Sequence, residues 1–391
     1  GSTVRGLRKY LTPFAPDQSG AVSVLYELGG LIAICDAGGC TGNVCGFDEP
    51  RWFEQKSALF SAGLRDMDAI LGRDDRLVEK LVDAASKLDV KFVAIIGTPV
   101  PAVIGTDYKA LGRMCEKRLN MPVITIDTDG MELYDVGEEK AWLELFRTFT
   151  EKGNPNLDIE KKRGKIGVLG LTPQDISDLR APKKIREYYQ EKEGKEAICY
   201  CMGENVGRMV YGLDNDRTAG EVEKNIVVSP AALAAAKYLE KTFGTPYEVT
   251  YPIVEELVPD MDYRGKKILI VHQQVIGNAM RAEIRRRCQK VNEDSSVDNN
   301  AAITVASWFM MKPELSEEGD ISFREEDDYM ELVKEEDYDI VFADPMMKRM
   351  TEDAYKMAGT GCVADAHETE RKRIFIDATH FAVSGKLREE M

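Results

Sequence analysis

The chain has 391 residues, and its hydrophobic content of 43% is typical of a globular protein with two or three α/β domains. Its formal net charge of −16 excludes a general nucleic-acid-binding protein, because such proteins present a basic face. No apolar run approaches the length of a membrane span and no signal-peptide pattern opens the sequence, so we expect a cytoplasmic protein without membrane contact. Its partners are then expected to be proteins and small molecules.

The first elements predicted along the chain lead into a segment rich in cysteine and glycine. Apolar residues three or four positions apart predict a helix over residues 17–31, and a short strand over residues 31–35 follows it. Trp52, Phe53 and Phe60 are expected in a helical stretch after that segment, where aromatic side chains mostly serve packing.

The next elements predict a parallel sheet. An amphipathic helix over residues 73–88 leads to an apolar strand over residues 91–96. Residues 104–107 begin another helix with a capping residue, and a further strand is expected at residues 122–127. Strand, helix and strand at this spacing form a βαβ unit, which implies parallel strands.

A polar stretch over residues 150–164 interrupts this periodicity and marks a domain boundary. Strands alternate with helices again beyond it, so the sequence predicts three α/β domains at residues 1–155, 156–260 and 261–391. The strands expected in the second and third domains are residues 165–171, 197–202, 225–229, 268–272, 302–308, 338–343 and 373–377. No Walker lysine motif or GxGxxG follows any of these strands, so the sequence predicts no nucleotide site.

Cys35, Cys40 and Cys45 lie at intervals of five in the glycine-rich segment after the first strand. Loops at the carboxyl ends of parallel strands commonly bind ligands, and glycines let the backbone approach them closely. Thiolates are the usual ligands of iron–sulfur clusters, but clusters held within one loop generally use tighter spacings such as C-x-x-C. The spacing therefore leaves two interpretations open, a cluster site or three buried apolar cysteines.

Four segments of the chain resemble the nitrogenase component 1 family. This family comprises the nitrogenase α and β subunits, the cofactor-assembly scaffolds, the dark-operative protochlorophyllide reductases and the nickel-sirohydrochlorin reductases. The resemblance lies in the glycine–cysteine loop and in three strand-and-turn segments, at residues 38–42, 97–107, 227–247 and 265–267. It covers nearly the whole chain and implies three Rossmann-like domains with mostly parallel sheets around a central cleft.

The departures from the family pattern narrow the expected function. Other family members carry further cluster cysteines where this chain has residues 12–16 and Thr98. Ser229 stands about where a cysteine holds the iron–molybdenum cofactor, which argues against dinitrogen as substrate. A 4Fe-4S cluster needs four ligands, and two from each chain of a symmetric dimer suffice.

The resemblance implies that Cys40 is a ligand of this interfacial 4Fe-4S cluster, with Gly39 beside it in the loop. Cys35 and Cys45 are alternative candidates for the second ligand. Asp36 is a candidate oxygen ligand, since an aspartate serves this role in one branch of the family. Cys199 and Cys201 share one face of a predicted strand and are expected in the core.

The resemblance also implies a function, the catalytic component of an ATP-dependent two-component reductase. A separate nitrogenase-reductase-like iron–sulfur ATPase would deliver electrons through the cluster to a small-molecule or tetrapyrrole substrate. The chain is expected to form a dimer with itself or with a paralogue. The alternatives are a non-catalytic scaffold for metallocluster or tetrapyrrole assembly and a solute-binding protein without a cluster.

His272 and His380 are the candidate proton donors of such a reduction. Each stands at or just after a predicted strand end in the third domain, where side chains can reach a ligand cleft. An imidazole is a natural donor in proton-coupled chemistry. The alternative for each is a hydrogen-bonded structural histidine.

Overall fold

The computed structural model describes ten segments of the chain. They are residues 8–35, 43–44, 48–53, 58–61, 74–99, 107–149, 163–200, 219–290, 300–358 and 372–388. The chain forms two compact units, one of residues 14–249 and the other of residues 1–13 and 250–391. The larger unit contains two sheets and the smaller contains one, and strands in all three sheets pair in parallel. The predicted α/β class with parallel sheets is confirmed.

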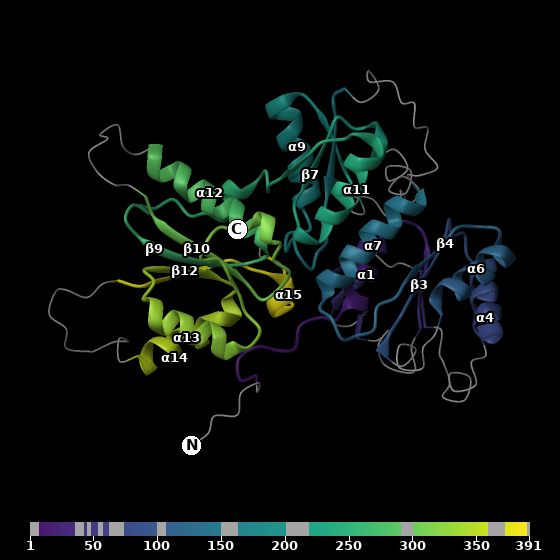
Figure 1. Cartoon of the computed structure of the whole chain (residues 1–391), viewed down its shortest axis with the longest axis horizontal. Helices are drawn as coiled ribbons and strands as arrows, with labels where there is room; N and C mark the ends of the chain where they lie inside the picture. The colour runs from purple at the N-terminus through teal and green to yellow at the C-terminus, as the bar shows by residue number, and fades with distance from the viewer. Residues whose placement is uncertain are drawn as a thin grey trace. The chain divides into compact units, whose positions relative to one another are not determined.

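The first sheet of the larger unit has the strand order β2-β1-β3-β4. Its strands are β1 (Leu31–Ile34), β2 (Ala58–Ser61), β3 (Val93–Ile96) and β4 (Val123–Ile126). One face carries α4 (Asp74–Ser86) and α6 (Tyr108–Leu119), and the other carries α1 (Asp17–Leu25) and α7 (Tyr134–Phe149) (Figure 1). The central strands β1 and β3 are buried along their whole length, as expected of strands covered on both faces.

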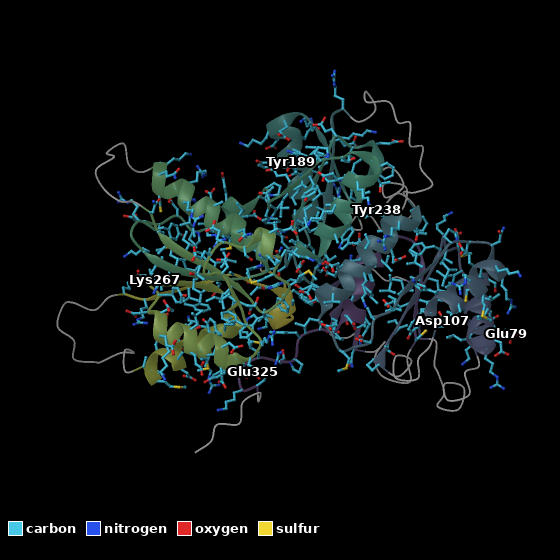
Figure 2. All side chains as sticks on the ribbon, in the orientation of Figure 1. Glu79, Asp107, Tyr189, Tyr238, Lys267 and Glu325 are labelled. Atoms are coloured by element: carbon cyan, nitrogen blue, oxygen red, sulfur yellow. The ribbon has the colours of Figure 1, made fainter. Side chains whose placement is uncertain are left out.

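Two local predictions in this region have different outcomes. Phe60 was expected in a helix, but it lies in β2, where it pairs with Ala33 of β1. The predicted cap of α6 is confirmed, since the Asp107 side chain accepts a hydrogen bond from Ala110 N–H at 3.0 Å. Asp107 is labelled in Figure 2.

The second sheet of the larger unit has the order β6-β5-β7-β8. Its strands are β5 (Lys165–Leu169), β6 (Glu196–Cys199), β7 (Lys224–Val227) and β8 (Tyr247–Val249), with α9 (Ala181–Glu193) and α11 (Leu233–Phe243) beside them. Short 3-10 turns link elements of both units: η2 (Pro50–Phe53), η4 (Ala219–Glu221), η5 (Pro230–Ala232), η6 (Val254–Leu257), η7 (Pro313–Leu315) and η8 (Pro345–Met347).

The sheet of the smaller unit has the order β11-β10-β9-β12-β13. Its strands are β9 (Lys267–Val271), β10 (Ala302–Ser307), β11 (Ile321–Ser322), β12 (Ile340–Ala343) and β13 (Ile374–Asp377). The helix α12 (Gln274–Lys290) covers one face, and α13 (Glu326–Glu336) and α14 (Lys348–Met357) cover the other, while α15 (Phe381–Ser384) follows β13 (Figure 1). Among the helices that the structure describes, none has the length and apolarity that a membrane crossing requires.

Helices α1 and α7 pack so closely that their contact requires glycine on both sides. A Cβ atom at Gly20 would lie 1.8 Å from the backbone oxygen of Tyr134. A Cβ atom at Gly137 would lie 1.7 Å from the backbone oxygen of Asp17. Neither overlap can be relieved by rotating a side chain, because the opposing atom belongs to the backbone.

We therefore expect Gly137→Ala to destabilise the larger unit by roughly 1–3 kcal/mol, because the added methyl group forces the two helices apart. Helix propensity by itself would make the same substitution stabilising by about 1 kcal/mol. A net destabilisation would therefore show that the close helix contact dominates. Urea denaturation followed by circular dichroism measures it. An unchanged or raised midpoint would show that α1 and α7 do not pack this closely.

Candidate functional site

The cysteine-rich loop begins at the carboxyl end of the first sheet, where hydrogen bonds hold its first residue. The backbone N–H of Cys35 donates to the carbonyl of Ile96 at 2.9 Å. The hydroxyl of Thr98 donates to the carbonyl of Cys35, and Thr98 is itself buried. Threonine thus ties the ends of β1 and β3 together at a position where the family pattern has a cysteine.

Four of the predicted site residues, Asp36, Gly39, Cys40 and Cys45, lie outside the described residues. Cys35 is described, and it is fully buried in the core between the first sheet and helices α4 and α6. Burial, and secondarily the neighbouring Cys35 thiol, raises the pKa of Tyr108 in the same core. Cys35 is therefore packed as a core residue, which is one of the two interpretations that the cysteine spacing leaves open.

The end of the loop is attached to α1 and to the segment after β5. The hydroxyl of Ser19 donates to the Asp48 carboxylate at 2.6 Å, and the side-chain amide of Gln174 donates to the Asp48 carbonyl at 2.6 Å. Burial raises the pKa of Asp48, while the Ser19 hydrogen bond opposes that shift. Both ends of the loop are therefore anchored by hydrogen bonds.

A buried ion-pair network lies directly after the loop. Arg51 Nε and Nη2 donate to the two carboxylate oxygens of Glu49 at 2.6 and 2.9 Å. Arg51 also contacts Glu27 Oε1 at 3.3 Å and donates to the Ser23 carbonyl of α1 at 2.8 Å. The three charged side chains are only 2–7% exposed.

The charge balance of this network determines its protonation state. Burial alone lowers the pKa of Arg51, but Glu49 and Glu27 outweigh that effect and raise it. The arginine therefore stays charged and clamps the returning chain onto α1. Sequence reasoning missed these residues, because a single arginine two positions after a glutamate has no periodic signal.

Ser229, about where the family has its cofactor cysteine, is fully buried at the end of β7. Its hydroxyl donates to Asp175 and accepts a hydrogen bond from Ala231 N–H at 3.2 Å. Tyr134 donates to the other oxygen of Asp175. A Cβ atom at Gly170 would lie 2.8 Å from Ser229 Cβ, so the backbone of Gly170 packs directly against the Ser229 side chain. Serine supplies no thiolate, and its hydroxyl is already engaged by Asp175, so these residues do not fit an iron–molybdenum cofactor.

His272 and His380 come together in the smaller unit although they are far apart in sequence. Their rings stack with centroids 4.5 Å apart and planes 12° apart, and both side chains are buried. His272 Nδ1 accepts from Gln273 N–H at 2.8 Å, which places the proton on Nε2, 3.2 Å from the Thr379 carbonyl. Burial, and secondarily His380, lowers the pKa of His272 well below its usual value.

Asp344 orders the turn that carries His380. One carboxylate oxygen accepts from the His380 backbone N–H at 2.9 Å and from the Ser384 hydroxyl at 2.9 Å. The other accepts from Met346 N–H at 2.8 Å. Phe309 meets the His380 ring edge to face at a centroid distance of 5.0 Å.

The remaining cysteines fall into two groups. Cys199 is buried as expected, and Cys115 and Cys288 are buried as well. Cys201 and Cys362 are not among the residues that the structure describes. Within the described part of the chain, no three His, Cys, Asp or Glu side chains are grouped so as to hold a metal ion.

The sequence matches the model of the nitrogenase component 1 type oxidoreductase family over residues 19–254. It is 23% identical over 194 residues to the nitrogenase iron-molybdenum cofactor biosynthesis protein NifE of Bradyrhizobium diazoefficiens, which covers 48% of this chain and 32% of that protein. It is 24% identical over 244 residues to the protein of the same name from Clostridium pasteurianum, and the match covers 61% of this chain and 48% of that protein. The chain thus spans less than half the length of each of these relatives.

Solved structures of nitrogenase Cp1 share the fold. The structure at pH 6.5 has a TM-score of 0.63 and 14% identity, and the match covers 90% of this chain and 86% of that one. The structure at pH 5 has a TM-score of 0.60 and 13% identity, and the match covers 92% of this chain and 84% of that one. Because the family model matches more than half of the sequence, the chain belongs to the nitrogenase component 1 type oxidoreductase family.

Proposed function

We propose that this protein is the catalytic component of a nitrogenase-like two-component reductase whose substrate is not dinitrogen. The observation that carries the proposal is the anchoring of the cysteine-rich loop at the carboxyl ends of β1 and β3. Thr98 holds the start of the loop, and the network around Arg51 holds its end. A loop fixed at both ends suits a metal centre, because ligands must be preorganised.

Cys40 and Cys45 would supply two thiolates from each chain, and a dimer with itself or a paralogue would complete a 4Fe-4S cluster. Such a cluster, when bound, supplies low-potential electrons one at a time. A nitrogenase-reductase-like ATPase would deliver those electrons. The engagement of Ser229 by Asp175 supports a substrate other than dinitrogen, since the cofactor thiolate is absent.

The proposal is tested with anaerobically purified full-length protein. About four irons per dimer are expected for one shared cluster. A nitrogenase-reductase-like ATPase with MgATP and dithionite should then reduce this cluster, and omission of ATP should prevent the reduction. An iron-loaded dimer that accepts no electrons under any of these conditions would argue against the reductase.

A second candidate function is a scaffold for metallocluster or tetrapyrrole assembly. The names of the NifE relatives favour it, since both are cofactor biosynthesis proteins. A scaffold would bind its cargo stoichiometrically and release it to an acceptor protein without ATP-dependent turnover. ATP-dependent turnover and cargo transfer, both measured on one preparation, distinguish the two functions. Turnover supports the reductase, and cargo transfer without turnover supports the scaffold.

His380 is our candidate proton donor for the reduction. Both ring nitrogens of His272 are engaged by backbone groups, so His272 is better suited to position its neighbour. We expect His380→Asn to lower turnover by about a hundredfold, the usual contribution of a general acid, with the iron content unchanged. Phe309→Leu is the control, because it alters the packing around His380 without removing a titratable group. Unchanged turnover of His380→Asn would make the pair purely structural, and loss of iron would contradict the proposed role.

A further inference from the structure

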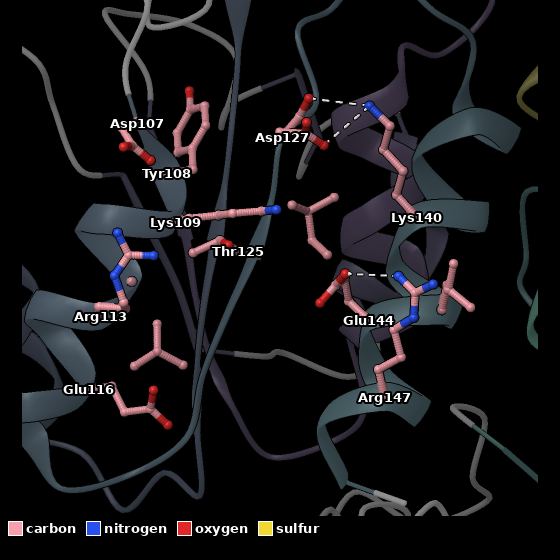
Figure 3. A pocket seen from close by; sticks show the side chains of 14 residues that line it. Asp107, Tyr108, Lys109, Arg113, Glu116, Thr125, Asp127, Lys140, Glu144 and Arg147 are labelled. Carbon is pink, nitrogen blue, oxygen red and sulfur yellow. Dashed lines mark hydrogen bonds and ion pairs between the residues drawn. The ribbon is translucent and has the colours of Figure 1, made fainter. Parts of the chain in front are cut away.

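A groove of about 730 Å³ lies along β4. Helix α6 forms one wall, helix α7 forms the other, and β4 forms the floor (Figure 3). The strand β4 is at the edge of its sheet, since β3 is its only described neighbour. The groove therefore follows an edge of the sheet as far as the structure describes it.

The outer edge of β4 presents unpaired backbone groups to this groove. The carbonyl of Pro122 accepts a hydrogen bond from Val93 N–H of β3 at 3.1 Å. The carbonyl of Ile126 accepts one from Gly97 N–H, just after β3, at 3.0 Å. In a parallel ladder every second residue bonds to the same neighbour, so Val123 and Thr125 direct their N–H and C=O groups outward. Both residues line the groove.

The four residues of β4 themselves carry none of the usual protection against strand pairing. Natural edge strands are commonly guarded by a charged residue, a proline or a bulge within the strand. The sequence of β4 is Val-Ile-Thr-Ile, and its register with β3 is unbroken. The charges of the groove belong to the two helices that flank it, to Asp107 just before α6 and to Asp127 just after β4.

The α6 wall carries two cations that form no ion pair with any described residue, Lys109 and Arg113, together with the carboxylates of Asp107, which caps α6, and Glu116. Lys109 extends from α6 across the groove beside Thr125 (Figure 3). Four residues along a helix rise about 6 Å, and two residues along a strand rise about 6.6 Å. Acidic side chains at alternate positions of an added strand would therefore meet both cations in register.

The two cations of the α7 wall are each paired with a carboxylate, one of them on the residue after β4. Lys140 lies 3.3 Å from Asp127, and Arg147 lies 3.7 Å from Glu144. Leu143 lies between these pairs and lines the groove. The side chains of an added strand that face α7 would accordingly be apolar.

We propose that this groove binds an extended segment of a partner protein as a fifth strand beside β4, with acidic residues facing α6 and apolar residues facing α7. Backbone hydrogen bonds to Val123 and Thr125 provide the affinity, and the alternate side chains provide the specificity. The proposal does not rest on the proposed reductase function, because it is argued only from described residues in and next to α6, β4 and α7.

The probe is a short acetylated and amidated peptide of alternating glutamate and valine, titrated into the full chain by calorimetry. Hydrogen exchange read by mass spectrometry should show protection of β4 when the peptide binds. A lysine–valine peptide should not bind, nor should a peptide of the same composition with its glutamates and valines in separate blocks. Equal binding of all three peptides, or binding without protection of β4, would overturn the proposal.

Two pairs of variants test the backbone and the charge contributions separately. Thr125→Pro removes an outward N–H and should abolish binding, whereas Thr125→Val retains it and should bind. Lys109→Glu with Arg113→Glu should weaken binding at least about tenfold, whereas Lys117→Glu with Arg118→Glu, an equal charge change on residues of α6 that do not line the groove, should not. If Thr125→Pro fails to fold, the charge variants still decide, and unaltered affinity of the double charge variant would overturn the proposal.

Discussion

Replacing Cys40 by serine is expected to remove most of the iron from the anaerobically purified protein, together with the spin-resonance signal of its reduced state. An iron–sulfur cluster persists only when its thiolate ligation is complete, and a hydroxyl is a poor substitute. Iron analysis and low-temperature spin resonance measure the loss. The effect should be close to complete, because each chain of the proposed dimer supplies only two ligands.

Cys199→Ser is the matched control for that variant. Cys199 is buried at the end of β6, where its sulfur lies 3.8 Å from the Pro182 carbonyl. A hydroxyl at an apolar site costs about 1–3 kcal/mol if it finds no partner, so this variant should lose some stability and keep its iron. Iron loss in both variants would point to a general folding defect.

Cys35→Ser and Cys45→Ser then identify the second ligand. The burial of Cys35 in the core leads us to expect that Cys45→Ser lowers iron to the level of Cys40→Ser, and that Cys35→Ser retains it. If Cys40→Ser keeps a full iron complement, the glycine–cysteine loop is only a structural turn. The family membership would then describe the fold without its chemistry.

Replacing Arg51 by methionine is expected to destabilise the protein by about 3–5 kcal/mol, the usual effect of removing one partner from a buried ion pair. The carboxylates of Glu49 and Glu27 are almost wholly buried and would remain without their cation. Urea denaturation of the iron-free protein measures the change without a contribution from cluster loss. Because Arg51 also holds the end of the loop, the iron content of the variant should fall as well.

Lys87→Met is the control for the loss of a cation. Lys87 pairs with Asp83 at 3.0 Å, but the two side chains are 72% and 67% exposed. Exposed pairs contribute at most about 1 kcal/mol, so the midpoint of this variant should hardly move. An Arg51→Met variant as stable as Lys87→Met would show that the network around Arg51 does not form.

Local sequence patterns did not predict two of the strands at the edges of the sheets. Strand β2 lies in a stretch expected to be helical, and β8 was not expected at all. Both are edge strands of three or four residues. A short apolar run has no periodicity that distinguishes strand from helix, so only pairing with a distant neighbour decides its conformation.

The sequence by itself determined the parallel α/β fold and the position of the cysteine-rich loop after the first strand. Strands buried on both faces must be continuous apolar runs, and helices between them must be amphipathic, so both leave local patterns. The Asp107 cap is similarly local, because a helix start needs an acceptor within the first turn.

Only the tertiary structure decided which polar side chains meet. The Arg51 network, the pairing of Ser229 with Asp175, and the stacking of His272 on His380 each join residues from separate segments of the chain. A buried charge or hydroxyl is stable only with a partner, and that partner is supplied by the path of the backbone. No spacing within a single segment encodes such a meeting.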